Sequence, residues 1–401
     1  MSDPSASAGG ALRIVHVFRS PVGGIFRHVR DLVHAQIAAG HSVGLVCDDN
    51  TGGAFEERNL ADLATHLDLG LHRITMDRSI TPRDFGVLWA LTRTLARLDA
   101  HVLHGHGAKG GAYARVVGTA MRLRGSRPAR LYCPHGGSVH YDGGALAGRL
   151  YFGLERAMAA MTDGLVFVSD YERAGYEAKV GKVSTPQALV RNGLMPEEFE
   201  PVALAEGASD FLYVGMLRDL KGPDLVLAAL PTVAERLGRK VTATIVGDGP
   251  ERDALERRAA AMNGVFVRFL DPMPARQAFA LGRVLVVPSR AESMPYIVLE
   301  TIAAHKPIIA TRVGGLPEIF AEHSGALVEP DDVDALAAAM RAELDGTRVA
   351  PAPADFARTM SERFSREAMV RAVDAAYRET LAAGRGSAAS PRTDRPLVSE
   401  G

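Results

Sequence analysis

Cysteine is scarce in this chain. Only Cys47 and Cys133 occur, and neither belongs to a Cys-x-x-Cys pair, which excludes a disulfide framework and a thiolate metal cluster and fits a reducing compartment. The formal net charge of -1 excludes a globally basic nucleic-acid binder. No apolar run approaches the ~20 residues that span a bilayer. The sequence therefore predicts a cytoplasmic protein, and any contact with a membrane would be peripheral.

Length and pattern indicate two α/β domains. The 401 residues exceed what one core of usual size accommodates. Short β-branched runs alternate with longer helical patterns, as in doubly wound parallel sheets with helices on both faces. Small residues and prolines after Asn192 and Gly193 indicate a linker, and the first ten residues lack the apolar segment of a signal peptide. We therefore expect a disordered tail at 1–10, a first domain at 11–200, a second at 201–362, a helix at 363–385 and a flexible tail at 386–401.

The expected strands alternate with helices in both halves. Those of the first domain lie at 12–18, 42–47, 101–104, 130–133 and 165–168, with helices at 25–39 and 150–161. Those of the second lie at 211–214, 241–246, 265–269, 284–287, 307–310 and 326–328, with helices that begin at Pro223 and near Glu251. A last amphipathic helix is expected at 366–383.

Two glutamates, Glu292 and Glu300, lie eight positions apart where a strand gives way to a helix. Pro295 suits the first helical position, because its missing N–H would be unpaired there. The helix N-terminus is electropositive, and the carboxyl end of a parallel strand opens onto a crevice. This short segment therefore offers amide donors for an anion and two carboxylates for hydroxyls, as a nucleotide-sugar site requires. Taken alone, two glutamates at this spacing are more often a solvated face.

Four further segments carry glycines or cations next to expected strands. They are Gly23-Gly24 at the first helix, Gly215-Met-Leu-Arg-Asp-Leu-Lys-Gly222, Gly247-Asp-Gly-Pro-Glu251 and Lys306 to Glu318. Gly23 and Gly24 fit a pyrophosphate-binding helix start or a simple tight turn. Arg218 and Lys221 would neutralise a diphosphate through charge-assisted hydrogen bonds, or they belong to a solvated loop.

Together and in this order, these segments resemble the retaining glycosyltransferases of the GT4 type, or group 1, which carry a Glu-x7-Glu motif in a GT-B fold. The amino-acid sequences of the segments 18–24 and 292–296 further resemble those of bacterial enzymes of cell-surface or exopolysaccharide assembly. The resemblance implies two Rossmann-like domains that face a central cleft, the first for the acceptor and the second for a UDP, GDP or other nucleotide sugar. It also implies retention at the anomeric carbon, no metal, no other cofactor, and a C-terminal helix that packs back on the first domain.

The resemblance also implies roles for individual residues. The catalytic group would be Glu292, Lys221, Arg218 and His135. The donor-binding group would be Gly23, Gly24, Gly215, Asp248, Ser293, Met294, Pro295, Tyr296 and Glu300. The acceptor-binding group would be His28 and, more weakly, His106. Two departures bear on the donor: Met216 replaces an arginine of the family, and Glu292-Ser-Met-Pro295 replaces Glu-Gly-Phe-Gly, so Pro295 removes an amide.

Two other motifs point elsewhere and are set aside. Gly105-x-Gly-x-x-Gly110 has the form of a dinucleotide site, but no acidic residue occurs from His101 through Tyr141 to bind a ribose. Asp332-x-Asp334 has the form of a metal site, and helix capping explains it better.

The same acid-free stretch is basic. It holds Lys109, Arg115, Arg122, Arg124, Arg127 and Arg130. A solvated helix face is the simpler interpretation, and a membrane-facing patch at Arg122, Arg124 and Arg127 is the sharper one. The expected partners are a nucleotide-sugar donor and a glycan or lipid-linked acceptor, with no nucleic acid. Rival functions are a nucleotide-sugar epimerase and a catalytically silent nucleotide-sugar-binding protein.

Overall fold

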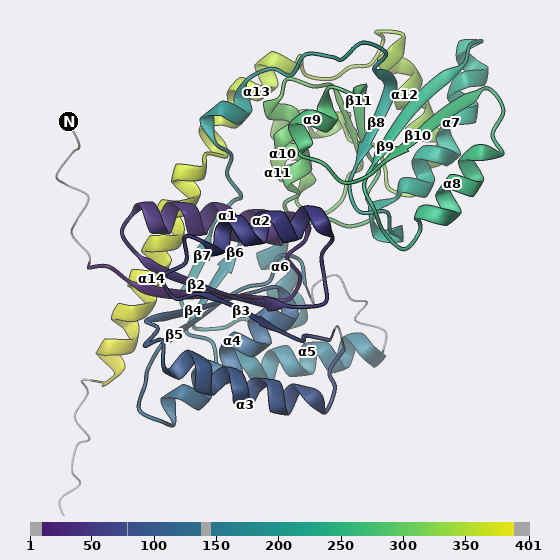
Figure 1. Cartoon of the computed structure of the whole chain (residues 1–401). Coiled ribbons are helices and arrows are strands. Elements are labelled where there is room, and N and C mark those ends of the chain that lie inside the picture. The colour runs from purple at the N-terminus through teal and green to yellow at the C-terminus, as the bar shows by residue number, and fades with distance from the viewer. Residues whose placement is uncertain (1–9, 78, 138–145, 389–401) are drawn as a thin grey trace, which may run out of the picture.

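The computed structural model describes residues 10–77, 79–137 and 146–388 (Figure 1). Residues 1–9 of the tail expected at 1–10, and the end of the chain from 389, lie outside these residues. The first half contains β1 (Arg13–Phe18), α1 (Gly23–Ala38), β2 (Ser42–Asp48), α2 (Ala54–Ala64), β3 (Leu71–Ile74), α3 (Arg83–Ala96), β4 (Val102–His106), α4 (Gly107–Arg122), β5 (Ala129–Cys133), α5 (Leu146–Ala159), β6 (Gly164–Phe167), α6 (Asp170–Lys179) and β7 (Gln187–Leu189).

The second half repeats this alternation after the 3-10 turn η3 (Pro196–Phe199). It contains β8 (Ser209–Val214), η4 (Asp219–Lys221), α7 (Pro223–Leu237), β9 (Val241–Val246), α8 (Arg252–Ala260), β10 (Val265–Leu270), α9 (Ala275–Phe279), β11 (Gly282–Val287), α10 (Tyr296–Ala303), β12 (Ile308–Ala310), α11 (Leu316–Phe320), η5 (Ala321–Ala326), α12 (Val333–Leu344), α13 (Pro353–Arg363) and α14 (Arg366–Ala388).

Both sheets are parallel and reverse their strand order at one point. The first has the order β3-β2-β1-β4-β5-β6-β7 and the second the order β10-β9-β8-β11-β12. The order reverses between β1 and β4 and between β8 and β11, and ligands bind at such switch points, outside the carboxyl ends of the strands. The loops that follow β8 and β11 carry Lys221 and Glu292. The topology therefore places these two side chains at the position where a doubly wound sheet binds its ligand.

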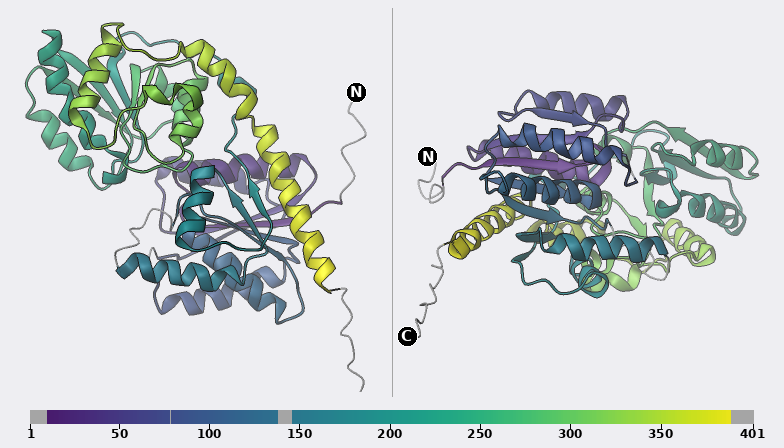
Figure 2. Two further views of the ribbon diagram at one scale, coloured as in Figure 1. Left: turned by 180° about the vertical axis from the view of Figure 1, so that it is seen from behind. Right: turned by 90° about the horizontal axis from the view of Figure 1, so that it is seen from below.

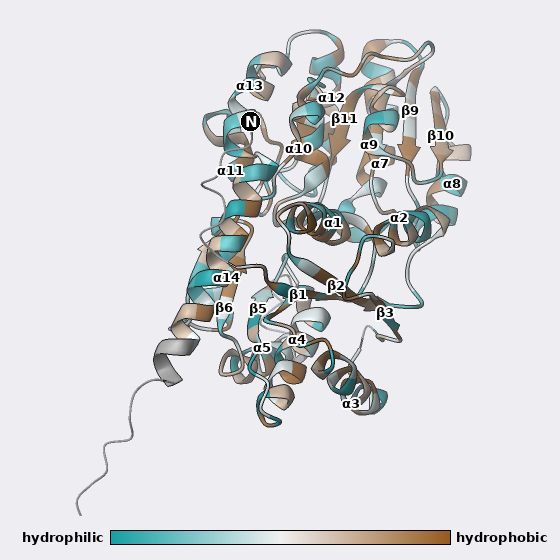
Figure 3. Cartoon of the chain, turned by 60° about the vertical axis from the view of Figure 1, so that its left-hand side comes forward, coloured by the Kyte–Doolittle hydropathy of each residue, from teal (hydrophilic) through white to brown (hydrophobic). Residues whose placement is uncertain are grey.

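Apolar strands and capped helices explain the local structure. The strands of both sheets are largely hydrophobic in Figure 3, as expected for sheets covered on both faces. Ser169 caps α6 by accepting from the Glu172 N–H at 3.0 Å, and Asp332 caps α12 by accepting from the Ala335 N–H at 2.8 Å. The cap at Asp332 confirms the interpretation of the Asp-x-Asp motif as a helix start.

The last helix returns to the first domain. α14 contacts α1, β5, β6 and β7, and Figure 2 shows it running along one face of that domain. It runs to Ala388, beyond the expected end at 385. The chain crosses near Gly193, where an added Cβ would lie 2.4 Å from the Ser365 carbonyl oxygen. This close approach requires glycine at the crossing.

Three strand expectations differ from the structure, and all three concern sheet edges. Residues 326–328 form no strand; Val328 makes a single bridge to Thr311. β3 and β7 were not expected, and they are the two edge strands of the first sheet. Their residues, LHRI and QAL, are only partly buried or exposed. Edge strands are short and partly polar, so the apolar pattern that marks a central strand is weak there.

The glycines of the Gly105-x-Gly-x-x-Gly110 motif pack helix α4 against the sheet. A Cβ on Gly110 would lie 2.4 Å from the Val17 carbonyl oxygen, and one on the neighbouring Gly111 would lie 2.2 Å from the Tyr132 ring. Contacts this close leave no room for a side chain. The motif therefore has a packing explanation, which agrees with the absence of an acidic ribose partner in the sequence.

Candidate active site between the two domains

The two residues at the second switch point form an ion pair. Glu292 Oε1 accepts from Lys221 Nζ at 2.6 Å and from Ser289 Oγ at 2.8 Å, and only 6% of Glu292 is exposed. The pair joins positions 71 residues apart in the sequence, because β8 and β11 are neighbours in the sheet. A buried carboxylate next to a lysine can exchange its partner for ligand hydroxyls while the lysine turns to a phosphate.

Glycines hold the loops around this pair in backbone contact. A Cβ on Gly314 would lie 1.7 Å from the Glu292 carbonyl oxygen, and one on Gly247 would lie 1.9 Å from that of Gly215. A Cβ on Gly222 would lie 2.2 Å from the carbonyl oxygen of Pro288. The separate glycine motifs of the sequence therefore have one common structural reason: they allow the loops after β8, β9, β11 and β12 to touch.

Glu300 lies on α10 and faces the first domain. Its Oε1 accepts from Arg27 Nη1 at 2.8 Å, while Arg27 also binds Glu198 and Asp31, each at 2.7 Å. Burial raises the pKa of Glu300 to about 7, and the attraction of Arg27 opposes that rise. Arg27 was not among the site residues predicted from the sequence. The available signal was its spacing of four residues from Asp31 on the first helix, beside Gly23 and Gly24.

Three predicted histidines meet at the carboxyl edge of the first sheet. His28 lies on α1, His106 ends β4, and His135 follows β5. His106 Nδ1 and His135 Nε2 are 3.0 Å apart, and the rings of His28 and His135 are 4.8 Å apart. His135 has a φ of 50°, a strained backbone that surrounding contacts must hold. His106 is only 1% exposed, so it supports His135 from behind.

Glu172 holds the loop of His135 and was not predicted. Its carboxylate accepts from the N–H of Gly136, the residue after His135, and from the N–H of Val168 at 2.9 Å. Burial raises the pKa of Glu172 to about 7, and these two backbone donors oppose the rise. The Ser-x-x-Glu capping pattern at Ser169 was the signal in the sequence, although that pattern gives no hint of a contact with residue 136.

Asn192 links the two halves of the chain. Its Oδ1 accepts from His28 Nδ1 at 3.0 Å and its Nδ2 donates to the Met294 carbonyl oxygen at 2.7 Å. Tyr296 lies beside it, with its hydroxyl 3.5 Å from His28 Nδ1, and a Cβ on Gly24 would be 3.8 Å from the Tyr296 ring. The glycine turn of the first domain therefore faces the helix that carries the glutamate motif.

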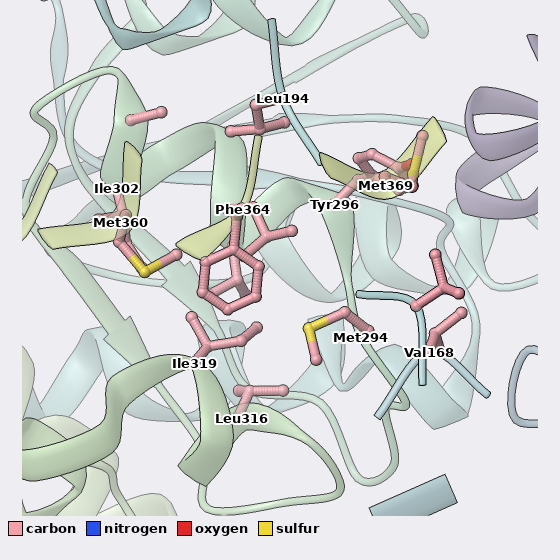
Figure 4. Close-up of a cluster of buried hydrophobic side chains, with 14 of the residues drawn as sticks. Val168, Leu194, Met294, Tyr296, Ile302, Leu316, Ile319, Met360, Phe364 and Met369 are labelled. Atoms are coloured by element: carbon pink, nitrogen blue, oxygen red, sulfur yellow. The ribbon is translucent and has the colours of Figure 1, made fainter. Parts of the chain in front are cut away.

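An apolar cluster below these polar contacts joins the halves. The cluster contains side chains of both halves, and Figure 4 shows Phe364 near Leu194 of the crossing segment and near Met294, Ile319 and Met360. Glu318 adds a polar link, since it accepts from the N–H groups of Asp170 at 3.0 Å and Tyr171 at 2.7 Å, the first residues of α6. The carboxylate thereby caps a helix of the other domain.

The remaining predicted residues of the second domain differ in how far they are buried. Pro295 is the N-cap of α10 and not its first helical residue. Ser293 and Met294 are buried, and Asp248 is exposed, with its carboxylate accepting from the Gly249 N–H at 2.8 Å. Arg218 Nε is buried without a hydrogen-bond partner among the described residues.

These features define a two-domain α/β protein with a ligand site between parallel sheets, in which one domain supplies a lysine and two carboxylates. The family description "Glycosyl transferases group 1" matches residues 208–345, and "Glycosyl transferase 4-like domain" matches residues 23–193. The chain therefore belongs to the group 1, GT4-type glycosyltransferases, a family of sugar-transferring enzymes with the GT-B fold.

Individual relatives agree with this family. The chain is 30% identical to a D-inositol 3-phosphate glycosyltransferase of Corynebacterium urealyticum over 56% of its own length and 58% of the relative's. It is 27% identical to a glycogen synthase of Mycobacterium tuberculosis over 94% of its length and 95% of the relative's. The match to the first of these relatives thus spans little more than half of that protein.

Solved structures show the same fold at lower identity. Sucrose-phosphate synthase of Thermosynechococcus elongatus superimposes with a TM-score of 0.72 at 21% identity, covering 92% of this chain and 100% of that one. The Anabaena protein HepE, in complex with UDP and glucose, gives a TM-score of 0.73 at 15% identity and covers 92% and 99%. At these identities the likeness concerns the fold alone.

Proposed function

We propose that this protein is a retaining, metal-independent glycosyltransferase that moves a sugar from a nucleoside-diphosphate sugar to a glycan or lipid-linked acceptor. The observation that carries the proposal is the Lys221–Glu292 pair at the second switch point, next to the start of α10. Family membership and the UDP bound to HepE support a nucleotide-sugar donor. Bacterial cell-surface or exopolysaccharide assembly remains the expected setting.

Each charged side chain has a distinct task in this mechanism. Lys221 and Arg218 neutralise the diphosphate that leaves, Glu292 accepts from hydroxyls of the donor sugar and stabilises positive charge at its anomeric carbon, and Glu300 accepts from the ribose. The leaving phosphate takes the acceptor proton on the same face of the sugar. Donors fixed before the reaction account for most of the rate.

The first domain supplies the acceptor side. His135 is half-buried on a loop that Glu172 holds, and it would contact the transferred sugar. His28 and His106 lie behind it in the first domain. Because Asn192 connects His28 to Met294 of the donor loop, the two substrate sites are structurally coupled.

The rival functions predict different products. A nucleotide-sugar epimerase changes the donor sugar without an acceptor, and a silent binding protein holds the donor without turnover. The Lys221–Glu292 pair favours a transferase, since binding alone does not require a cation placed to stabilise a leaving diphosphate.

The test uses a panel of UDP-, GDP- and ADP-sugars in EDTA. Slow donor hydrolysis and thermal shift are followed for the wild type, Glu300→Ala and Lys221→Ala, with the exposed Lys240→Ala as the matched control. We expect one donor to stabilise the wild type and Lys240→Ala and to turn over only with these two. Stabilisation by no nucleotide sugar would contradict the proposal, and epimerised donor would favour the rival enzyme.

A peripheral membrane contact is proposed at a surface that keeps two of the three expected arginines. Arg122 and Arg130 both bind Asp163, at 2.5 Å and 2.8 Å, and are thereby neutralised. Arg115 is fully buried and pairs with Glu155 at 2.9 Å. Of the expected patch, Arg124 and Arg127 remain exposed.

Exposed apolar side chains support a contact with anionic lipid. Leu123 is 87% exposed next to Arg124, and on α3 Phe85 is 80% and Trp89 56% exposed, with the Arg93 guanidinium over the indole. Aromatic and basic side chains together suit a membrane interface. No described helix has the length and apolar character needed to cross a membrane.

The membrane contact can be measured directly. Trp89 is the only tryptophan, so its fluorescence should shift to the blue with anionic vesicles and not with neutral ones. Charge reversal at Arg124 and Arg127 should reduce vesicle pelleting. If the fraction of protein that pellets with vesicles changes neither with the vesicle charge nor with these substitutions, the contact is refuted.

A further inference from the structure

Five buried or half-buried histidines form a continuous cluster in the first domain. They are His16 on β1, His28 on α1, His104 and His106 on β4, and His135 after β5. His16 Nδ1 and His106 Nε2 are 2.9 Å apart, and His106 Nδ1 and His135 Nε2 are 3.0 Å apart. The ring centroids of His28 and His106 are 5.7 Å apart, and those of His28 and His135 are 4.8 Å apart.

The hydrogen bonds of His28 direct its lone pair into the cluster. The Met294 carbonyl can only accept, so the amide nitrogen of Asn192 faces Met294 and its Oδ1 faces His28. His28 Nδ1 must therefore carry the proton, which leaves Nε2 unprotonated. This Nε2 is buried and has no hydrogen-bond partner among the described residues. An unpartnered buried acceptor is costly unless something occupies it.

The tautomer of His106 is set in the same way. Gln36 Oε1 accepts from His16 Nε2 at 2.8 Å, so His16 Nδ1 is an acceptor and His106 Nε2 donates to it. The Nδ1 lone pair of His106 therefore points to His135. In this structure it accepts from His135 Nε2.

We propose that His28, His106 and His135 form a binding site for a divalent transition-metal cation of the Zn²⁺ class. One nitrogen of each lies within 4.8 Å of the others. Tetrahedral Zn–N bonds of about 2.0–2.1 Å place ligand nitrogens roughly 3.4 Å apart, which is close to the 3.0 Å between His106 Nδ1 and His135 Nε2. Three neutral imidazoles suit Zn²⁺, Cu²⁺ or Ni²⁺ and not Mg²⁺ or Ca²⁺.

Protons balance when the metal binds. His28 Nε2 and His106 Nδ1 already present lone pairs, and His135 changes from its Nε2–H to its Nδ1–H tautomer, so each imidazole stays neutral and no net proton is released. Asn192 and His16 then accept from the ring N–H groups opposite the metal, as outer-shell partners of metal-bound histidines usually do.

The alternative trio of His16, His104 and His106 also lies within 4.8 Å, but it suits a metal less well. Both ring nitrogens of His16 are already engaged, by His106 and Gln36. All three residues are at most 1% exposed, so a metal there would have no solvent-facing position for a water or an exchanging ligand.

The site gives the metal an inhibitory role in transfer. This consequence rests on the proposed function, because it assumes that His135 contacts the transferred sugar. A metal bound to His135 Nε2 would occupy the ring nitrogen that would otherwise contact the sugar. Metal binding itself does not depend on that assumption, so it can be tested without any sugar substrate.

The experiment titrates the metal-stripped full chain with Zn²⁺ against a chromophoric chelator and with Co²⁺ by visible absorption. We expect saturation at a single equivalent and the d–d bands of a tetrahedral Co²⁺ site. His28→Ala and His135→Asn should abolish both signals; asparagine tolerates the positive φ of position 135. Asn192→Ala should weaken binding roughly 10–100-fold.

The matched control removes an exposed pair of histidines. The ring centroids of the exposed His34 and His66 are 6.3 Å apart. The double variant His34→Ala/His66→Ala should bind the metal as the wild type does. If His28→Ala fails to fold, His135→Asn at the cleft decides. The proposal is overturned if the wild type binds no metal, if binding survives His135→Asn, or if binding disappears with the surface pair. Metal binding without donor turnover would contradict the transferase and leave the metal site intact.

Discussion

Glu292 and Lys221 are each other's partner in this structure, so removing either has two consequences. Lys221→Ala removes the cation proposed for the diphosphate and also leaves a buried carboxylate unpaired. We expect kcat to fall by roughly 10²–10³ and the thermal midpoint to fall as well. The double variant Lys221→Ala/Glu292→Gln should regain stability but not turnover. If the double variant regains turnover, the pair has a structural role only.

The buried carboxyl of Glu172 should contribute a measurable pH dependence to the stability of the fold. Its pKa is raised to about 7, so between pH ~4.5 and ~7 the folded state keeps a proton that the unfolded state releases. Stability from this group is therefore present at low pH and lost as the pH rises towards 7. A tenfold difference in the acid dissociation constant between the folded and unfolded states corresponds to about 1.4 kcal/mol of unfolding free energy.

Glu172→Gln provides the comparison. The difference in thermal midpoint between the wild type and the variant should change with pH from 5 to 8, in favour of the wild type at the acid end. Buried histidines act in the opposite sense, because their lowered pKa values cost stability as the pH falls, but they are common to both proteins and cancel. A difference that is independent of pH would show that Glu172 does not titrate in this range.

At the scale of elements, the carboxyl ends of β8, β9, β11 and β12 form the site because their loops touch through glycine. Gly314→Ala tests this directly. Gly314 has a φ of 57° and its added Cβ would lie 1.7 Å from the Glu292 carbonyl oxygen. Strain and displacement together should destabilise the fold by about 1–3 kcal/mol or more and abolish donor binding.

Gly325→Ala is the matched control, since an added Cβ there meets nothing within 4 Å. Urea unfolding and donor thermal shift are measured for both variants. We expect Gly325→Ala to match the wild type. Equal behaviour of the two variants would mean that the loop of Glu292 adjusts without loss.

At the scale of the whole molecule, Arg27 connects the two domains through Glu300 and also holds Asp31 and Glu198. Arg27→Met should lower the thermal midpoint and make it more sensitive to pH, because three buried or half-buried carboxylates lose a shared cation. Arg30→Met is the control: Arg30 lies on the same helix and only approaches Asp31 at 4.0 Å. Equal midpoints for the two variants would contradict this role of Arg27.

The sequence by itself determined the architecture and located the loop and helix of the proposed donor site. β-branched runs defined the central strands, where both faces are buried, and the segment from Glu292 to Glu300 lies on a single loop and helix, so local pattern was sufficient. It did not reveal β3 and β7, because edge strands lack a continuous apolar pattern. It also misplaced a strand at 326–328, where one bridge replaces a ladder.

Only the tertiary structure decided which distant groups meet. Four hydrogen bonds of the site join residues that lie 36 to 273 positions apart in the sequence. They link Arg27 to Glu300, Glu172 to Gly136, and Asn192 to both His28 and Met294. Their partners are determined by strand order and by the crossing of the chain at Gly193, which no local periodicity encodes. The histidine cluster has the same origin, because parallel strands bring their carboxyl ends to one edge of the sheet, and residues scattered along the sequence become neighbours there.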